Sequence, residues 1–279
     1  MKLALVQMKG KNTNDENMEI ALKKISEAAA TGADIVVLPE MFSCPYKASN
    51  FPVYAQPDGG ENWQKLSDCA KKHEIYLVAG SMPESSGTST SPGSQKIYNT
   101  SYVFNRKGEQ IAKHRKMHLF DCDIPSARFH ESDTLSAGND VTVFDTEFGK
   151  IGLMICFDIR FPELSRLMAD RGARLVIVPA AFNMTSGPAW WELMFRTRAT
   201  DNQFFMAGCS PARDEKAGYV AWGHSIFVDP FGKVLAQLDE KEAILCVDVD
   251  LKQVEDFRRQ YKILAARRKD IYRLEEVRV

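Results

Sequence analysis

The chain contains 279 residues, 44% of them hydrophobic, which is enough for a sizeable core in one large α/β domain. Its 36 basic and 37 acidic residues give a net charge of −1, so composition offers no electrostatic basis for binding nucleic acid or an anionic membrane. No apolar run approaches the roughly 18 residues of a membrane span, and the short apolar start does not resemble a signal peptide.

The six cysteines are scattered along the chain, and none lies at C-x-x-C spacing. This pattern indicates neither a zinc site nor a disulfide framework, so we predict no metal and no cofactor. Unpaired thiols are typical of a reducing compartment. We therefore expect a cytoplasmic protein, and a mitochondrial pool stays open.

The first predicted unit is a strand, a helix and a second strand. Residues 2–7 read as a short buried strand, and Thr13 with Glu16 forms a capping box for a helix with apolar residues at helical spacing. A second buried strand, 34–40, ends in Glu40, and the two strands are expected to be parallel. A charge at the end of an apolar strand is costly without a partner, so Glu40 either caps a turn or lines a site.

The middle of the chain is predicted to form short elements and loops. They are a helix over 61–73, a strand over 75–80, a surface loop over 84–95, a hairpin of 99–105 with 109–114, a basic cluster over 113–118 and an irregular loop over 121–139. Lys116 lies in the basic cluster and, taken alone, reads as a solvated surface charge.

Cys156 ends the most informative stretch of the chain. Residues 141–145 and 150–156 are predicted to pair around a turn, and Pro162 then suits the first turn of a helix that ends at Gly172. Open α/β sheets bind ligands at this end of their strands, and a helix N-terminus there favours a thiolate. Taken alone, Cys156 reads better as a small buried hydrophobe, because free cysteine is among the most buried residue types.

A strand over 174–179 completes a second strand–helix–strand unit. Both units close with an apolar run into proline, at Pro39 and Pro179, which suggests two similar halves packed so that Glu40 and Cys156 meet. The remaining expected elements are a helix over 188–203, a strand over 204–209, a hairpin of 225–229 with 233–238, a strand over 243–249 and an amphipathic helix over 251–268. No linker-like break divides the chain, so 1–279 is predicted to be a single domain.

A nucleophilic cysteine needs a base, and acyl transfer needs a group that holds the developing oxyanion. His118 and His130 lie in predicted loops from which either can reach a site, although no local signature supports a Cys–His pair. A carboxylate is the alternative base, and Glu40 is the candidate, although spacing alone does not decide whether it caps a turn or lines a site.

Seven blocks, in order along the chain, resemble the nitrilase (carbon–nitrogen hydrolase) superfamily from residue 2 to about residue 272. Three resemble its catalytic blocks: Pro39-Glu-Met-Phe42 with Pro45-Tyr46, Arg115-Lys-Met-His-Leu-Phe-Asp121, and Gly152-Leu-Met-Ile-Cys-Phe-Asp-Ile-Arg-Phe-Pro-Glu-Leu164. The others are Glu131-Ser-x-Thr-Leu-Ser136, Ala181-Phe-Asn-Met-Thr185 with Gly187-Pro, Asp201-Asn-Gln203 and Ser210-Pro-Ala-Arg-Asp214. The last two, with Trp222-Gly-His-Ser225, resemble the omega-amidase branch.

The resemblance implies a catalytic Glu-Lys-Cys triad. It assigns the base to Glu40, the nucleophile to Cys156 and the cation that holds the oxyanion to Lys116, with Glu131 in support and the backbone N–H of Phe157 as a second oxyanion donor. The pocket residues that it suggests are aromatic walls and possible carboxylate partners, namely Phe42, Tyr46, Phe157, Phe182, His118, Arg160 and Arg115. For Arg160, a structural ion pair with Asp158 or Glu163 is an equal alternative.

Three positions depart from the superfamily pattern. Phe157 stands where a Tyr is common, Ala137 replaces a usual Pro, and Thr200 replaces a usual Val. None of these changes removes a catalytic group, so they leave only the fine substrate specificity open.

The superfamily also implies an α/β fold of four layers, an α-β-β-α sandwich, although periodicity alone allows a single doubly wound sheet. It implies a homodimer or larger oligomer, with the region from about 251 at the interface. The expected activity is an amidase acting on small dicarboxylic acid monoamides, with 2-oxoglutaramate first and 2-oxosuccinamate second. The alternatives are a sister hydrolase (deaminated glutathione amidase, N-carbamoyl amine hydrolase or nitrilase) and a non-enzymatic interaction protein, against which the intact triad argues.

Overall fold

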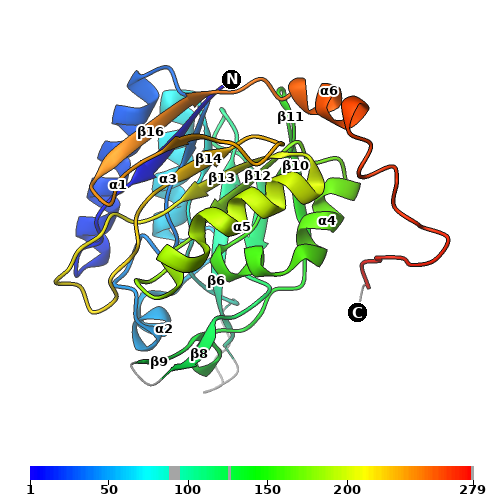
Figure 1. Cartoon of the computed structure of the whole chain (residues 1–279). Coiled ribbons are helices and arrows are strands. Elements are labelled where there is room, and N and C mark those ends of the chain that lie inside the picture. Colours follow the sequence, from blue (N-terminus) through cyan, green and yellow to red (C-terminus); the bar gives the residue numbers. More distant parts are fainter. Residues whose placement is uncertain (88–94, 125–126, 278–279) are drawn as a thin grey trace.

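The computed structural model describes residues 1–87, 95–124 and 127–277 as two main β-sheets packed face to face, with helices on both outer faces (Figure 1). Each sheet is covered by two helices: α1 (Asn14–Ala30) and α3 (Glu61–His73) on the larger, α4 (Pro162–Asp170) and α5 (Ser186–Asn202) on the smaller. A separate apolar layer fills the space between the sheets. The predicted α-β-β-α sandwich is therefore confirmed, and the single doubly wound sheet is wrong.

The larger sheet has eight strands in the order β16-β1-β2-β4-β6-β5-β3, with β7 paired to β6. β1 and β2 are parallel, with Leu3 opposite Ile35, as the first strand–helix–strand unit predicts. The strands are β1 (Lys2–Gln7), β2 (Ile35–Val37), β3 (Gln56–Pro57), β4 (Tyr76–Val78), β5 (Met82–Ser85), β6 (Ile97–Phe104), β7 (Gln110–Arg115) and β16 (Ala243–Asp248).

The smaller sheet has six strands in the order β10-β11-β12-β13-β14-β15. β11 and β12 are parallel, with Ile151 opposite Leu175, which confirms the second strand–helix–strand unit. The strands are β10 (Thr142–Thr146), β11 (Gly149–Leu153), β12 (Leu175–Pro179), β13 (Phe205–Cys209), β14 (Ile226–Val228) and β15 (Val234–Gln237).

Thr13 begins α1 in the predicted capping arrangement. Its hydroxyl oxygen accepts a hydrogen bond from the backbone N–H of Glu16 at 3.3 Å and donates one to the Glu16 carboxylate at 2.6 Å. Met18, Ala21 and Ile25 then repeat on one helix face and are buried against the larger sheet. The start of the helix is therefore set by neighbouring residues. β2 follows the helix and leads the chain to Glu40, the first candidate catalytic residue.

One predicted loop, 84–95, begins inside a strand. β5 includes Glu84, which is buried and paired with the guanidinium of Arg115. A buried strand that carries a carboxylate lacks the apolar alternation that identifies strands in a sequence. Residues 88–94 of this loop lie outside the described part of the chain.

The predicted irregular loop over 121–139 contains a two-stranded ribbon of β8 (Asp121–Ile124) and β9 (Ala127–His130). Its strands carry charged residues, so no apolar pattern marks them. The remaining short elements are η1 (Ala48–Asn50), α2 (Phe51–Tyr54), η2 (Glu131–Asp133) and η3 (Cys156–Arg160).

The C-terminal helix is shorter than predicted. We expected it over 251–268, but α6 spans Gln253–Gln260, and Tyr261 has an extended backbone. The side-chain amide of Gln203 donates to the carbonyls of Phe257 and Tyr261, which satisfies acceptors that the helix end leaves free.

The apolar residues expected on that helix do not form one exposed stripe. Val254 is fully buried between the sheets, and Leu264 packs against the core under α4 and α5. Past α6 the chain runs along the outside of the molecule (Figure 1), and Arg267 forms an ion pair with Asp170 of α4. Tyr261, which follows α6, stays strongly exposed.

Candidate active site

Glu40 and Cys156 follow strands of different sheets and lie at the same end of the sandwich. The chain reaches Glu40 just after β2, and it turns into η3 at Cys156 shortly after β11 ends at Leu153, earlier than predicted. Cys156 has a φ of 45°, and Met41, next to Glu40, has a φ of 50°. Residues other than glycine rarely adopt this left-handed region, and those that do cluster at functional sites.

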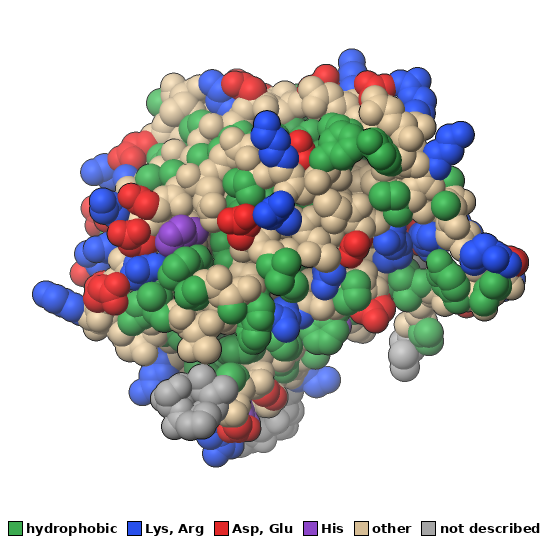
Figure 2. Space-filling view, in the orientation of Figure 1, with side chains coloured by type: hydrophobic (Ala, Val, Ile, Leu, Met, Phe, Trp, Pro, Cys, Tyr) green, Lys and Arg blue, Asp and Glu red, His purple; other side chains and the backbone are tan. Residues whose placement is uncertain are grey.

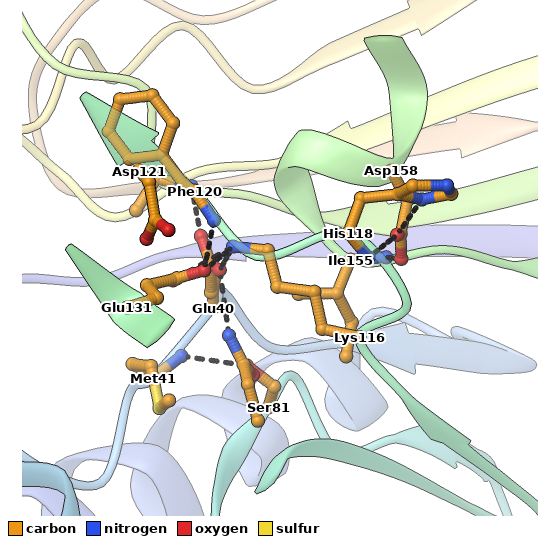
Figure 3. A network of polar contacts seen from close by, with 12 residues as sticks. Glu40, Met41, Ser81, Lys116, His118, Phe120, Asp121, Glu131, Ile155 and Asp158 are labelled. Carbon is orange, nitrogen blue, oxygen red and sulfur yellow. Dashed lines mark hydrogen bonds and ion pairs between the residues drawn. The ribbon is translucent and has the colours of Figure 1, made fainter. Parts of the chain in front are cut away.

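Lys116 is fully buried between two carboxylates (Figure 3). Its Nζ lies 3.0 Å from Oε1 of Glu40 and 2.9 Å from both carboxylate oxygens of Glu131. Burial works against the charge, but Glu131 and Glu40 outweigh it and hold the pKa of Lys116 well above its usual value. Lys116 is therefore an enclosed cation and not the solvated charge that its basic segment suggests.

Glu131 is held by donors besides the lysine. The backbone N–H of Phe120 donates to Oε2 at 2.7 Å, and the hydroxyl of Tyr46 donates to Oε1 at 3.2 Å. Burial, with Glu40 and Glu131, raises the pKa of the Tyr46 phenol well above its usual value, so the phenol keeps the proton that it donates. Glu131 can therefore hold the cation in one position.

Two groups that the sequence analysis missed orient Glu40. The side-chain amide of Asn99 donates to Oε1 at 2.9 Å, and the backbone N–H of Ala181 donates to Oε2 at 2.8 Å. The carbonyl of Asn99 also accepts the backbone N–H of Lys116 at 2.8 Å. Ala181 follows the proline that ends β12, so the matching apolar runs of the two halves do meet here, whereas no sequence pattern pointed to Asn99.

The thiol of Cys156 is protonated at rest. Burial raises its pKa well above the usual value, Glu40 raises it further, and Lys116 opposes them without prevailing. We expected a helix N-terminus to favour the thiolate, but η3 is one short turn and the loss of solvent outweighs it. Attack by this cysteine therefore requires a base, and Glu40 is the carboxylate with the largest effect on it.

Asp158 joins the segment that carries the lysine to the turn that carries the cysteine. Its Oδ1 accepts the backbone N–H groups of Met117 and His118 at 3.2 and 2.9 Å, and its Oδ2 accepts that of Ile155 at 3.0 Å. The imidazoles of His114 and His118 lie 3.0 and 2.8 Å from the same carboxylate. Burial would raise the pKa of Asp158, but these contacts hold it far below its usual value.

A narrow cavity of 20 Å³ lies against Cys156. Three of the predicted substrate-binding residues, Phe157, Arg160 and Phe182, line it. The guanidinium carbon of Arg160 is 4.1 Å from the ring centroid of Trp190, and its Nη1 is buried with no hydrogen-bond partner among the described residues. The cavity beside the thiol is therefore lined by aromatic rings and by Arg160, one nitrogen of which has no hydrogen-bond partner among the described residues.

The other predicted pocket residues lie outside that cavity. Phe42 and Tyr46 line a larger neighbouring cavity of 670 Å³. His118 lines neither cavity, because its ring is bonded to the buried Asp158. Arg115 is held by Glu84, with Nε and Nη2 2.9 and 2.6 Å from its carboxylate oxygens. Both side chains are thus held by buried carboxylates.

Metal ligands do not cluster in the described chain: over 1–87, 95–124 and 127–277, no three His, Cys, Asp or Glu side chains gather closely enough to hold an ion. No helix in these ranges is both long and apolar enough to cross a bilayer. All six thiols are unpaired.

The site brings together a protonated thiol, a carboxylate and an enclosed cation. The thiol and carboxylate supply a nucleophile with its base, and the cation can stabilise negative charge that develops on a carbonyl oxygen. Acyl transfer through a thioester is the chemistry that this set can perform.

Known proteins resemble this chain over nearly its whole length. The carbon-nitrogen hydrolase family matches residues 2–259. Omega-amidase NIT2 of Mus musculus is 48% identical over 275 residues, which cover 98% of this chain and 97% of that protein. Nit3 of Saccharomyces cerevisiae, a member of branch 10 of the nitrilase superfamily, is 41% identical and superimposes with a TM-score of 0.86 over 96% of each chain.

An amidase from Nesterenkonia sp. AN1 is a more distant structural relative. It is 27% identical, with a TM-score of 0.79 over 97% of this chain and 95% of its own. A variant of that amidase carries the acetamide moiety of fluoroacetamide on its active-site cysteine.

Proposed function

This chain belongs to the carbon–nitrogen hydrolase family, and on that premise we propose that it hydrolyses the terminal amide of small dicarboxylic acid monoamides to the acid and ammonia. 2-Oxoglutaramate is the first choice of substrate, and 2-oxosuccinamate is the second. As a member of the family it is a hydrolase of carbon–nitrogen bonds other than peptide bonds. The proposal extends to this chain the activity in the name of its mouse relative, an omega-amidase.

The observation that carries the substrate class concerns Arg160, which lines the cavity beside Cys156 and whose buried Nη1 has no hydrogen-bond partner among the described residues. A buried donor without a partner is rare, because the loss of water is not compensated. Asp158, one expected partner, is already bonded to His114 and His118. An arginine binds a carboxylate through two parallel hydrogen bonds, so we infer that the distal carboxylate of the substrate pairs with Arg160.

The contacts of the site support the catalytic roles that we propose. Glu40 takes the thiol proton of Cys156, and the sulfur attacks the amide carbon to form a tetrahedral oxyanion. Lys116 and the backbone N–H of Phe157 hold this oxyanion, and Glu131 holds Lys116 in place. The protonated Glu40 returns the proton to the nitrogen, ammonia leaves, and a thioester remains.

The second half of the cycle uses the same base. Glu40 removes a proton from water, the resulting hydroxide adds to the thioester carbon, and collapse of the oxyanion expels the Cys156 sulfur, which regains a proton. The products are one carboxylic acid and one ammonia for each amide and water consumed.

Ammonia release from a panel of small amides, nitriles and ureas tests this function. We expect kcat/KM for succinamic acid to exceed that for butyramide, its analogue without the carboxylate, because butyramide leaves the cationic donor unpaired. Equal values, or a clear preference for a nitrile or an N-carbamoyl amine, would move the assignment to a sister branch of the superfamily.

We further propose a homodimer or larger oligomer. Figure 2 shows hydrophobic side chains on the outer surface near α5 and α6. Large apolar residues there are strongly exposed, among them Leu193 at 54%, Phe231 at 50% and Tyr261 at 55%. A second copy would cover them, since contiguous exposed apolar patches mark interfaces. Light scattering that finds a monomer at micromolar concentration would contradict this assignment.

We propose that residues 1–279 form a single domain, of which the family match covers 2–259. We propose a cytoplasmic location, supported by six unpaired thiols.

A further inference from the structure

Tyr219 stands between the narrow cavity at Cys156 and the large cavity beside it. Only Tyr219 and Ala181 line both cavities among the described residues. The Tyr219 ring packs at a tilt against that of Tyr46, with centroids 4.3 Å apart, and against that of Phe129, with centroids 5.8 Å apart. Its hydroxyl donates to the carbonyl of Ala181, so the ring is fixed at both its face and its end.

The loop that carries Tyr219 is anchored on both sides of its exposed tip. The backbone N–H of Ala212 donates to the carbonyl of Met8 at 2.9 Å, and that of Trp222 donates to the carbonyl of Phe182 at 2.7 Å. Residues 215–218 are exposed, and Tyr219 follows them directly. Tyr219 is therefore a single side chain between the two cavities, and backbone hydrogen bonds hold the base of its loop in place.

The two cavities have different charged residues of the site in their linings. Arg160 lines only the narrow cavity, whereas Glu40 lines only the large one. With the acyl carboxylate at Arg160 and the carbonyl carbon at Cys156, the amide nitrogen points toward Glu40, which returns its proton. The large cavity therefore lies on the side of the leaving amine, behind Tyr219.

We propose that Tyr219 is a specificity-determining residue that restricts the leaving group to ammonia by separating Cys156 from the large cavity. This inference rests on the proposed function. The space behind Tyr219 measures 670 Å³ against 20 Å³ in front of it, so removal of the ring would open room for a substituent on the amide nitrogen.

The charge of the large cavity defines which substituent it would take. Lys11, Lys47 and Lys216 line it and are exposed, whereas Asp214 and the buried Glu40 are its acidic residues. Its wall also includes apolar side chains. An amine that carries a carboxylate, such as an amino acid, is therefore the chemical class that fits, because its carboxylate can reach the lysines.

The test compares amide substrates that share one acyl group. For wild type, Tyr219→Ala and Tyr219→Phe, kcat/KM is measured on succinamic acid, on its N-ethyl amide and on the amide of succinic acid with glycine. Each N-substituted value is divided by the value for succinamic acid, which makes the ratio independent of the fraction of folded enzyme. Phe129→Ala is the matched control, because it removes a ring from the same aromatic stack without lining the cavity at Cys156.

We expect Tyr219→Ala to raise the ratio for the glycine amide by about tenfold or more, a typical effect of relieving a steric exclusion in a pocket. Tyr219→Phe and Phe129→Ala should leave the ratio near that of wild type. In Tyr219→Ala, the ratio for the glycine amide should exceed the ratio for the N-ethyl amide. An unchanged ratio in Tyr219→Ala, or an equal rise in Phe129→Ala, would overturn the inference. A wild-type enzyme without activity on succinamic acid would instead overturn the proposed function.

Discussion

Oδ1 of Asp158 lies 2.8 Å from Nδ1 of His118 and accepts the backbone N–H of the same residue at 2.9 Å. His118 belongs to the segment that carries Lys116, and Asp158 belongs to the turn that begins at Cys156. One buried carboxylate thereby fixes the position of Lys116 relative to Cys156. Neither Asp158 nor His118 lines a cavity of the site, so this contact positions other residues.

Asp158→Asn should lower the free energy of unfolding by about 3–5 kcal/mol, because it leaves buried donors without their charged acceptor. The folded-state pKa of Asp158 is depressed, so its stabilising contribution is complete above the usual pKa of about 4 and is lost as the pH falls below it. The difference between wild type and variant, measured by urea unfolding, should therefore be largest at neutral pH and shrink in acid.

Asp145→Asn is the matched control, since Asp145 pairs with Lys150 at the surface with 77% of its side chain exposed. It should change the free energy of unfolding by less than about 1 kcal/mol. An equal loss in both variants would contradict the role given to Asp158.

Lys116→Arg should keep the charge and lose about 10²–10³-fold in kcat, because the planar guanidinium cannot reproduce one ammonium enclosed by Glu40 and Glu131. Lys113→Arg on β7, whose side chain is partly exposed, is the control and should retain near wild-type turnover. Steady-state ammonia release from succinamic acid measures both. Near-full kcat in Lys116→Arg would mean that Lys116 does not hold the oxyanion.

Glu131→Gln should reduce kcat by about 30-fold and leave the fold intact. The substitution keeps the shape but replaces a charge-assisted contact with Lys116, worth about 2 kcal/mol, by a neutral one. Circular dichroism and the thermal midpoint are measured with the rate. A variant that is both inactive and unfolded would assign Glu131 a structural role.

Cys156→Ala should fold normally and lose nearly all turnover, since removal of a covalent nucleophile costs several orders of magnitude. A general thiol reagent is a poor probe, because Cys246 is exposed whereas burial raises the pKa of Cys156. Fluoroacetamide, which modified the active-site cysteine of a variant of the Nesterenkonia amidase, should instead label Cys156, and succinamic acid should block the labelling. Mass spectrometry of peptides locates the label, and substantial activity in Cys156→Ala would rule out the thioester route.

The strand ends that carry the chemistry were predictable from the sequence, because each depends on local pattern. The apolar runs before Glu40 and Cys156 mark buried strands, and the capping box of Thr13 marks the helix between the first pair. Each of these features can be recognised from residues that are neighbours in the sequence. The sheet pairing then brought both ends to one place.

The partners of the charged residues were not predictable, because they come from distant parts of the chain. Arg115 is held by Glu84 on a strand that carries no apolar signal, and His118 turns inward to Asp158. Neither side chain lines a cavity at the site, and the sequence alone left open which of Arg115, His118 and Arg160 would bind a carboxylate. Asn99 likewise contacts Glu40 from β6, and no periodicity distinguishes it from its neighbours.

Arg160→Met should lower kcat/KM for succinamic acid by about 10²-fold, because it removes charge-assisted hydrogen bonds worth roughly 3 kcal/mol to the substrate carboxylate. Butyramide makes no such contact, so its kcat/KM should stay close to wild type. Arg160→Lys retains the charge but not the bidentate geometry of the guanidinium. Its kcat/KM for succinamic acid should therefore fall between those of wild type and Arg160→Met. The comparison of two substrates in one protein cancels any loss of folded enzyme, so an equal decline on both would show that Arg160 supports the fold through Trp190 and not the substrate.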